Sequence, residues 1–240
     1  MLGNSIFITI DTDWASDEVL EYTIDMLEEN NVKATFFFTH ETALLNRLYN
    51  SSLFEIGIHP NFQYILNGIS EFANMRQALD AIMKVVPMAV SVRSHCLVQS
   101  SPLLELFFQS GLRYDVNLFL PWYSSMVLKP FTLPNGLTRV PFFWEDDIQC
   151  TTSQRPQGWD ANQMLKSKGL KIFNFHPIHL FLNTENIKRY EQAKIYHNDF
   201  EKLKEFRFLG ESGTCSFFSN VLNLAKKRNM EFKLIRDIQR

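Results

Sequence analysis

Short apolar runs of strand length alternate along this chain with segments of helical periodicity. This alternation predicts a parallel sheet whose strands are joined by crossover helices. The runs are apolar at successive positions, which indicates strands covered on both faces, as in a doubly wound sheet or a (β/α) barrel. We expect strands at 6–10, 34–38, 54–58, 88–92, 112–116, 137–143, 170–175 and 231–235.

Helices are predicted between the strands, at 17–30, 41–50, 71–86, 102–109 and 217–228. Ser16 is the N-cap candidate of the first helix. The apolar face of that helix is predicted to contain Val19, Leu20, Thr23, Ile24 and Leu27. The segments 121–135 and 149–160 are expected to be loops. No repeat or Gly/Ser linker interrupts the series, so we expect residues 1–240 to form a single domain.

Charge and cysteine content bear on partners and compartment. The 24 Lys and Arg residues against 26 Asp and Glu residues give a formal net charge of −2, which favours neither nucleic acid nor an anionic membrane as a partner. We expect no integral membrane segment, and the first residues do not resemble a signal peptide, so a cytoplasmic location is expected. Cys96, Cys150 and Cys215 form no Cys-x-x-Cys pair and are predicted to be reduced core thiols.

Side chains that bind metals or transfer protons follow most of the predicted strands. They are Asp11 and Asp13, His40, His59, Arg93 and His95, the acidic string 144–147, and His176 with His179. The carboxyl ends of barrel strands meet at one rim, where active sites are assembled. We therefore expect these residues to form one site.

Asp11 and Asp13 lie one residue apart and would point to the same side of the chain. A divalent cation would relieve the repulsion between their carboxylates. The Asp-x-Asp pattern also fits a solvated turn, a metal-dependent glycosyltransferase, or a haloacid-dehalogenase-type phosphatase with Asp11 as nucleophile. An EF-hand loop is excluded because Ala15 and Ser16 occupy its next ligand and glycine positions.

The ordered set of motifs resembles the NodB-type polysaccharide deacetylases, metal-dependent carbohydrate esterases that remove acetyl groups from sugars. The matching pieces are Asp11 with Asp13, the Ala-Thr-Phe-Phe strand at 34–38, the Glu-Ile-x-x-His segment at 55–59, Arg93-Ser94-His95, the acidic and aromatic 144–147, and the histidine-terminated strand 173–176. The resemblance implies an α/β fold, a distorted (β/α) barrel of about seven parallel strands. It also implies one divalent metal at the rim, most often zinc.

In this family an aspartate and two histidines hold the metal, which assigns Asp13 and His59 as ligands. The family's second histidine lies four residues after the first, where this chain has Gln63. We expect His95 to supply the third ligand, because it follows the next strand along. Asn61 and Gln63 remain alternative oxygen ligands, and His40 is a candidate to support a ligand from behind.

The resemblance and the needs of amide hydrolysis also suggest catalytic roles. Asp11 would be the general base, Arg93 would hold it charged and oriented, and His176 would be the general acid. Asp146 or Asp147 would pair with His176. The residues expected to face the substrate are Trp14, Trp144, Asp146, Asp147 and His179. For the aromatic residues core packing is the alternative, and for His179 the alternative is a bond to a backbone carbonyl.

These features predict a metal-dependent hydrolase that removes an N-acetyl or other small acyl group from a sugar. The expected substrate is a nucleotide- or lipid-linked precursor in surface-polysaccharide synthesis. Two alternatives remain at this stage. One is a phosphatase that uses Asp11, and the other is a barrel that binds sugar without hydrolysing it, which the loss of the family histidine at Gln63 favours.

Overall fold

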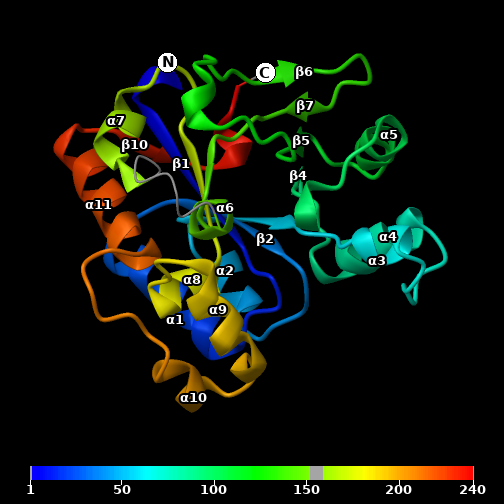
Figure 1. Ribbon diagram of the computed structural model, residues 1–240. Coiled ribbons are helices and arrows are strands. Elements are labelled where there is room, and N and C mark those ends of the chain that lie inside the picture. Colours follow the sequence, from blue (N-terminus) through cyan, green and yellow to red (C-terminus); the bar gives the residue numbers. More distant parts are fainter. Residues whose placement is uncertain (1, 152–158, 240) are drawn as a thin grey trace.

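One curled β-sheet forms the centre of the protein, described here from a computed structural model of residues 2–151 and 159–239 (Figure 1). The strands follow the spatial order β6-β7-β5-β4-β3-β2-β1-β9-β8, and β10 also pairs with β1. They are β1 (Ser5–Asp11), β2 (Ala34–Phe38), β3 (Phe54–Ile58), β4 (Ser91–Val92), β5 (Tyr114–Asp115), β6 (Phe131–Thr132), β7 (Thr138–Arg139), β8 (Trp144–Glu145), β9 (Ile172–Phe175) and β10 (Glu231–Lys233). Between the named strands of the described chain, only the β6–β7 pair is antiparallel.

The strands β7 and β8 lie near opposite ends of this order but belong to one stretch of chain. Thr138 aligns with Tyr114 of β5, whereas Trp144 aligns with Phe173 of β9. The chain therefore passes from one edge of the sheet to the other and curls it round. This arrangement confirms the predicted distorted (β/α) barrel. The predicted strand 137–143 contains only the short strand β7, and β8 begins one residue after its predicted end.

The first strand is the central element of the sheet. All of its residues are buried, as its apolar sequence predicts. It pairs in parallel with β2, with β9 and, at its start, with β10. Because β1 ends at Asp11, its two aspartates emerge at the carboxyl edge between β2 and β9.

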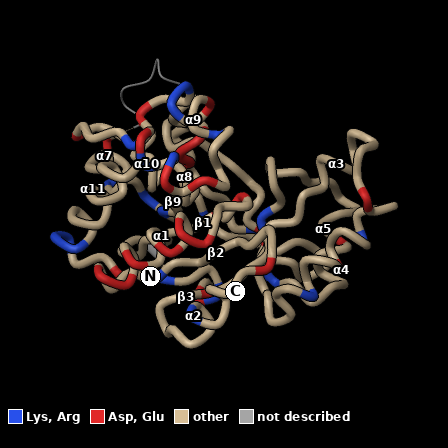
Figure 2. Tube along the Cα trace, turned by 90° about the horizontal axis from the view of Figure 1, so that it is seen from below, with Lys and Arg blue, Asp and Glu red and all other residues tan. Residues whose placement is uncertain are grey.

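Helices lie around the sheet, with α3, α4 and α5 to one side and α7 and α11 to the other (Figures 1 and 2). Acidic and basic residues are interspersed along the chain (Figure 2). The helices are α1 (Asp17–Glu29), α2 (Leu45–Tyr49), α3 (Gln63–Leu66), α4 (Met75–Val85), α5 (Ser101–Gln109), α6 (Asp146–Thr151), α7 (Ala161–Lys166), α8 (Pro177–Leu182), α9 (Ile187–Ala193), α10 (Phe200–Lys204) and α11 (Thr214–Lys227). Short 3₁₀ turns include η2 (His95–Leu97), η3 (Trp122–Ser124), η5 (Lys194–Tyr196) and η6 (Ile235–Asp237).

The predicted helices are present, several of them shorter than expected. The buried face of α1 consists of the five residues that its periodicity predicts. Ser16 occupies the N-cap position of α1, but its side chain makes no capping hydrogen bond. The short helices α7 to α10 were not predicted, because none is long enough to display a full apolar period.

The predicted loops contain some regular structure. Segment 121–135 includes η3 and the short strand β6. The helix α6 enters the predicted loop 149–160, of which residues 152–158 lie outside the described chain. All three cysteines are free, but only Cys150 is buried; Cys96 is exposed, so the prediction of three core thiols is wrong for Cys96. Across the described residues, no helix has both the length and the apolar character needed to cross a membrane.

The buried side chains form two clusters. The larger cluster fills the sheet and its flanking helices, and it includes Ile8, Phe36 and Phe175. The smaller cluster lies where α1 meets α8, α9 and α10. Its buried members are Val19, Phe181, Leu182, Ala193 and Leu203, and Tyr190 and Tyr196 pack against it. The strands that end at the rim therefore rest on the larger cluster, whereas α9 and η5 rest on the smaller one.

Candidate metal centre and active site

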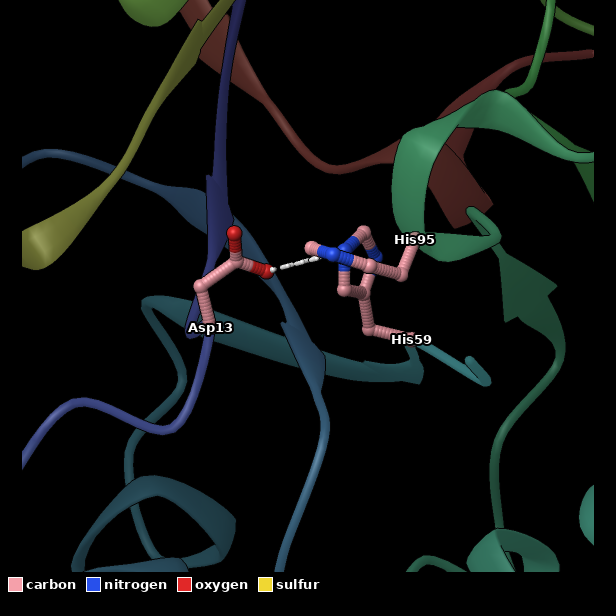
Figure 3. A group of neighbouring side chains, drawn as sticks. All are labelled: Asp13, His59 and His95. Atoms are coloured by element: carbon pink, nitrogen blue, oxygen red, sulfur yellow. Dashed lines mark hydrogen bonds and ion pairs between the residues drawn. The ribbon is translucent and has the colours of Figure 1, made fainter. Parts of the chain in front are cut away.

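Asp13, His59 and His95 converge at the carboxyl ends of β1, β3 and β4 (Figure 3). The Asp13 Oδ1 atom lies 3.1 Å from Nε2 of His59 and 3.2 Å from Nδ1 of His95. Possible ligand atoms of all three residues lie within 4.8 Å of one another. The structure thus brings together the aspartate and both histidines that the sequence analysis selected.

Backbone contacts between neighbouring strands and turns place these side chains. The His59 N–H donates to the carbonyl of Phe38, and the His95 N–H donates to the carbonyl of Pro60. Asp13 and Trp14 both have left-handed backbone angles, with φ of 40° and 57°. Such angles are uncommon outside glycine, so the turn after β1 needs support from its surroundings.

The electrostatics of this group suit a divalent cation. Burial by itself would raise the pKa of Asp13, but hydrogen bonds from His59 and His95 lower it well below its usual range. Burial by itself would lower the pKa of His95, and its hydrogen bond to Asp13 raises it to about 10. A charged carboxylate between two imidazole rings fits the carboxylate and nitrogen donors that zinc and similar ions prefer.

The second nitrogen of His59 faces the other aspartate of the pair. Its Nδ1 is buried without a hydrogen-bond partner among the described residues and lies 3.8 Å from Oδ1 of Asp11. The imidazole of His59 therefore stands between Asp13 and Asp11. With Nε2 directed at the candidate ion position, Nδ1 remains available to donate toward Asp11.

Asp11 is held by a buried cation and a buried amide. Its Oδ1 accepts a hydrogen bond from Arg93 Nη1 at 2.9 Å, and its Oδ2 accepts one from Asn174 Nδ2 at 2.8 Å. The guanidinium of Arg93 is fully buried between the rings of Phe37 and Phe142. This packing leaves the carboxylate of Asp11 fixed in orientation and compensated in charge.

His176 faces Asp11 and Asp13 from the end of β9. Its Nδ1 lies 2.6 Å from Oδ1 of Asp146. Its Nε2 lies 4.0 Å from Oδ2 of Asp11 and 3.6 Å from Oδ2 of Asp13. Burial by itself would lower the pKa of His176, but the charges of Asp146 and Asp147 raise it well above its usual value. The partner of His176 is thus Asp146.

A pocket of about 60 Å³ lies among these groups, lined by Asp11, Asp13, His59, His95, Glu145, Asp147 and His176 among others. A water molecule occupies about 30 Å³ in the liquid, so this space suits a small reacting group and not a sugar ring. Two larger pockets, of about 260 Å³ and about 430 Å³, share Trp14 and Tyr64 in their linings. The smaller of the two also contacts His59, and the larger contacts Asp13 and His95.

Three of the five residues expected to contact substrate lie at the pockets or beside His176. Trp14 is 39% exposed, lies edge-on to the His95 ring and lines both larger pockets. Asp147 lines the small pocket, and one of its oxygens is buried without a hydrogen-bond partner among the described residues. Asp146 is fully buried and contacts His176.

The structure corrects the expectation for Trp144. Its side chain is only 2% exposed and stacks on Phe217 of α11 with ring centroids 4.5 Å apart. It is a core residue and offers no face to a sugar. His179 is also buried; its Nδ1 lies 3.1 Å from the Thr184 hydroxyl, and its ring packs edge-on against His176.

The alternative ligands Asn61 and Gln63 lie just before α3 and at its first residue. The Asn61 side chain accepts the backbone N–H of Gln63 at the start of α3, and Gln63 is exposed. His40 is linked to the metal group through the turn that follows β1. Its Nδ1 lies 2.8 Å from the Thr39 hydroxyl, which accepts the backbone N–H of Trp14. His40 therefore supports the turn that carries Asp13.

Asn174 is a member of the site that the sequence analysis gave no role, and Glu145 was predicted only as part of the acidic string 144–147. Asn174 is fully buried; it donates to Asp11 and to Glu145, and it accepts hydrogen bonds from Thr9 and Arg93. Burial raises the pKa of Glu145 well above its usual value. The signal for Asn174 was its position two residues before His176, because alternate residues of a strand share a face.

Comparison with known proteins places the chain in a family. The sequence profile of the WbmS-like polysaccharide deacetylases matches residues 8–194, which include every residue of this site. The chain belongs to this family. It is 37% identical to WbmS of Bordetella bronchiseptica, assigned as a polysaccharide deacetylase involved in O-antigen biosynthesis. That match covers 93% of this chain and 92% of the other, with a TM-score of 0.87.

More distant structures share the fold of this WbmS-like deacetylase. A polysaccharide deacetylase assigned in Mycobacterium smegmatis is 18% identical, with a TM-score of 0.52 and coverage of 95% and 91% of the two chains. The peptidoglycan N-acetylglucosamine deacetylase Bc1960 is 13% identical, with a TM-score of 0.54 and coverage of 98% and 87%. No curated protein matches the chain. Family membership favours a deacetylase over the phosphatase alternative. A phosphatase mechanism based on Asp11 would also leave the converging histidines without a role.

Proposed function

We propose that this protein is a metal-dependent deacetylase of an N-acetylated sugar, in which Asp13, His59 and His95 bind one divalent ion, most often zinc. The observation that carries the proposal is the convergence of these three side chains beside an Arg93–Asp11 pair and an Asp146–His176 pair. When bound, such an ion lowers the pKa of water and polarises an acyl oxygen.

Asp11 acts as the general base. Its carboxylate lies close to the metal group, and Arg93 and Asn174 hold both of its oxygens. In this orientation Asp11 takes a proton from the water that attacks the carbonyl carbon of the acetamido group. Arg93 compensates the charge of the base through a buried, charge-assisted hydrogen bond.

His176 acts as the general acid. Its Nδ1 is engaged by Asp146, so Nε2 is the atom that can give a proton to substrate. The Nε2 atom lies 3.6 Å and 4.0 Å from the carboxylates of Asp13 and Asp11, across the small pocket. Proton transfer from Nε2 to the sugar nitrogen lets the C–N bond break, and it releases acetate and the amine.

The proposed substrate is a nucleotide- or lipid-linked sugar used in surface-polysaccharide synthesis. Two facts support it: the Bordetella relative is assigned to O-antigen biosynthesis, and the small pocket opens beside two pockets large enough for the rest of a substrate. The alternative, a barrel that binds sugar without hydrolysing it, was favoured by the loss of the family's second histidine at position 63, where this chain has Gln63. With His95 beside Asp13, the site has an aspartate and two histidines without Gln63.

The test compares metal content and acetate release in wild type, His95→Ala and the matched control Gln63→Ala. We expect about one equivalent of a transition metal in wild type and in Gln63→Ala. His95→Ala should lose the metal and the activity together. Circular dichroism of each variant confirms that it is folded.

Asp11→Asn separates metal binding from catalysis. It should keep the metal and lose acetate release by at least about 10²-fold. Loss of the metal from Asp11→Asn would show that the roles of the two aspartates are exchanged. Full metal retention in His95→Ala would return the third ligand to Asn61 or Gln63.

A further inference from the structure

The pocket of about 430 Å³ beside the metal group has a wall that the proposed chemistry does not use. On one side it is lined by Asp13, Trp14 and His95. On the other side its lining comes from α9 and η5, with Tyr190, Lys194 and the adjacent His197. A substrate whose acetamido group reaches the small pocket would extend its remaining atoms along this wall.

Lys194 supplies a cation to the pocket. Its side chain is exposed, and its ammonium lies 5.9 Å from the centroid of the Tyr190 ring. No carboxylate of the described chain forms an ion pair with it. His197 lies on the same wall and is also exposed. This side of the pocket therefore offers a cation and an imidazole without an internal counter-ion.

Ser16 also lines the pocket and carries a hydroxyl group. Its Oγ is buried and has no hydrogen-bond partner among the described residues, although Ser16 is the N-cap of the 13-residue helix α1. The N–H groups of the first helical turn favour an anion, and Ser16 does not cap them. The two acidic side chains of that turn, Asp17 and Glu18, are absent from the pocket lining, and Asp17 accepts a hydrogen bond from Thr42.

The neighbouring pocket of about 260 Å³ differs in chemistry. Its lining includes Phe72, Ile82 and Val85, together with the acidic Glu71, and no lysine or arginine of the described chain lines it. An anionic group on the substrate would thus be disfavoured there. Of these two pockets, the one lined by Lys194 is the one in which a described residue offers a lysine or arginine cation.

We propose that the pocket lined by Ser16, Lys194 and His197 binds the phosphate that links the sugar to its carrier. This assignment rests on the proposed function and specifies its substrate class as a sugar phosphate or diphosphate. Lys194 and His197 pair with phosphate oxygens, and the Ser16 hydroxyl, which has no partner among the described residues, is available to donate to them. The acetylated sugar lies between this phosphate and the small pocket.

The test measures equilibrium binding to the metal-loaded protein by calorimetry, with inorganic phosphate, N-acetylglucosamine 1-phosphate and unphosphorylated N-acetylglucosamine as probes. We expect both phosphate probes to bind wild type at least 10-fold more tightly than Lys194→Ala. Lys194→Glu should bind them still more weakly. Lys188→Ala, an exposed lysine on α9 outside the pocket lining, is the matched control and should behave as wild type.

Equal phosphate affinity in wild type and Lys194→Ala, or no binding of either phosphate probe, would overturn the proposal. A carboxylate-bearing sugar, N-acetylmuramic acid, is the third arm. A Lys194 dependence for this probe alone would show that the anion belongs to the sugar and not to the carrier link. Acetate release is measured separately, so a protein that binds phosphate through Lys194 but releases no acetate would contradict the deacetylase proposal and leave the phosphate site standing.

Discussion

Asp146 holds His176 at two atoms. Its Oδ1 lies 2.6 Å from the ring Nδ1, and its Oδ2 accepts the backbone N–H of His176 at 2.8 Å. One carboxylate therefore fixes the position of the residue and the rotation of its ring. The free Nε2 is left facing the two aspartates that follow β1.

Asp146→Asn should impair the general acid without removing it. Its charge is the leading influence that raises the pKa of His176 against burial, so the neutral variant lowers that pKa. Because the acid must be protonated, the alkaline limb of the pH–rate profile should move to lower pH, and kcat should fall by about 10²-fold. The profile of kcat/KM against pH checks this. An unmoved alkaline limb would remove His176 from the mechanism.

Arg93→Met should destabilise the fold because it leaves the buried Asp11 carboxylate without its cation. Removing one partner of a buried ion pair costs about 3–5 kcal/mol. Chemical denaturation measures the loss in the free energy of unfolding. The double variant with Asp11→Asn should recover part of it, because the unpaired charge is gone. Strict additivity of the two losses would show that the pair is not coupled.

Gly57→Ala should separate β3 from β4. A Cβ at this position would lie 2.6 Å from Oγ of Ser91 and 2.8 Å from a ring carbon of Phe37. Overpacking of this kind costs about 1–3 kcal/mol, and it would displace His59 just beyond the end of β3. We expect a lower Tm and weaker metal binding. Gly3→Ala, with no atom within 4 Å of its Cβ position, is the control and should match wild type in both measurements.

Glu55 should make stability fall as the pH rises. Burial raises its pKa, although Thr35, Ser91 and the Arg236 backbone donate hydrogen bonds to it. The folded state then binds this proton more tightly than the unfolded state. Stability should decline from the ordinary glutamate range up to the raised pKa. The difference in unfolding free energy between wild type and Glu55→Gln, measured from pH 4 to pH 8, should show this slope; a flat difference would contradict it.

The apolar runs predicted β1, β2 and β3 closely, because strands buried on both faces admit few polar residues. Because the carboxyl ends of barrel strands meet at one rim, the sequence also predicted that Asp13, His59 and His95 belong to one site. The register that joins these strands depends on contacts between distant segments. That His95 lies beside Asp13 was therefore a hypothesis until the pairing of β3 with β4 was known.

Contacts from later in the chain explain what the sequence could not supply. Trp144 is buried because Phe217 of α11 stacks on it. The residues near Trp144 in the sequence give no indication of this contact with a distant helix. In the sequence, Asn174 is a polar residue within an otherwise apolar strand, and its function is not apparent. Its place beside Asp11 follows from the pairing of β9 with β1, in which Thr9 aligns with Asn174.

The two hydrophobic clusters support different parts of the proposed active site. The metal group and its proton-transfer residues extend from strands anchored in the larger cluster, whereas Tyr190 and the neighbouring η5 turn pack on the smaller one. Under the proposed assignment, substitutions in residues 187–206 would change the phosphate pocket and leave the strands that hold the metal group unchanged. Relatives with one reaction and different sugar carriers are the expected evolutionary result of such modularity.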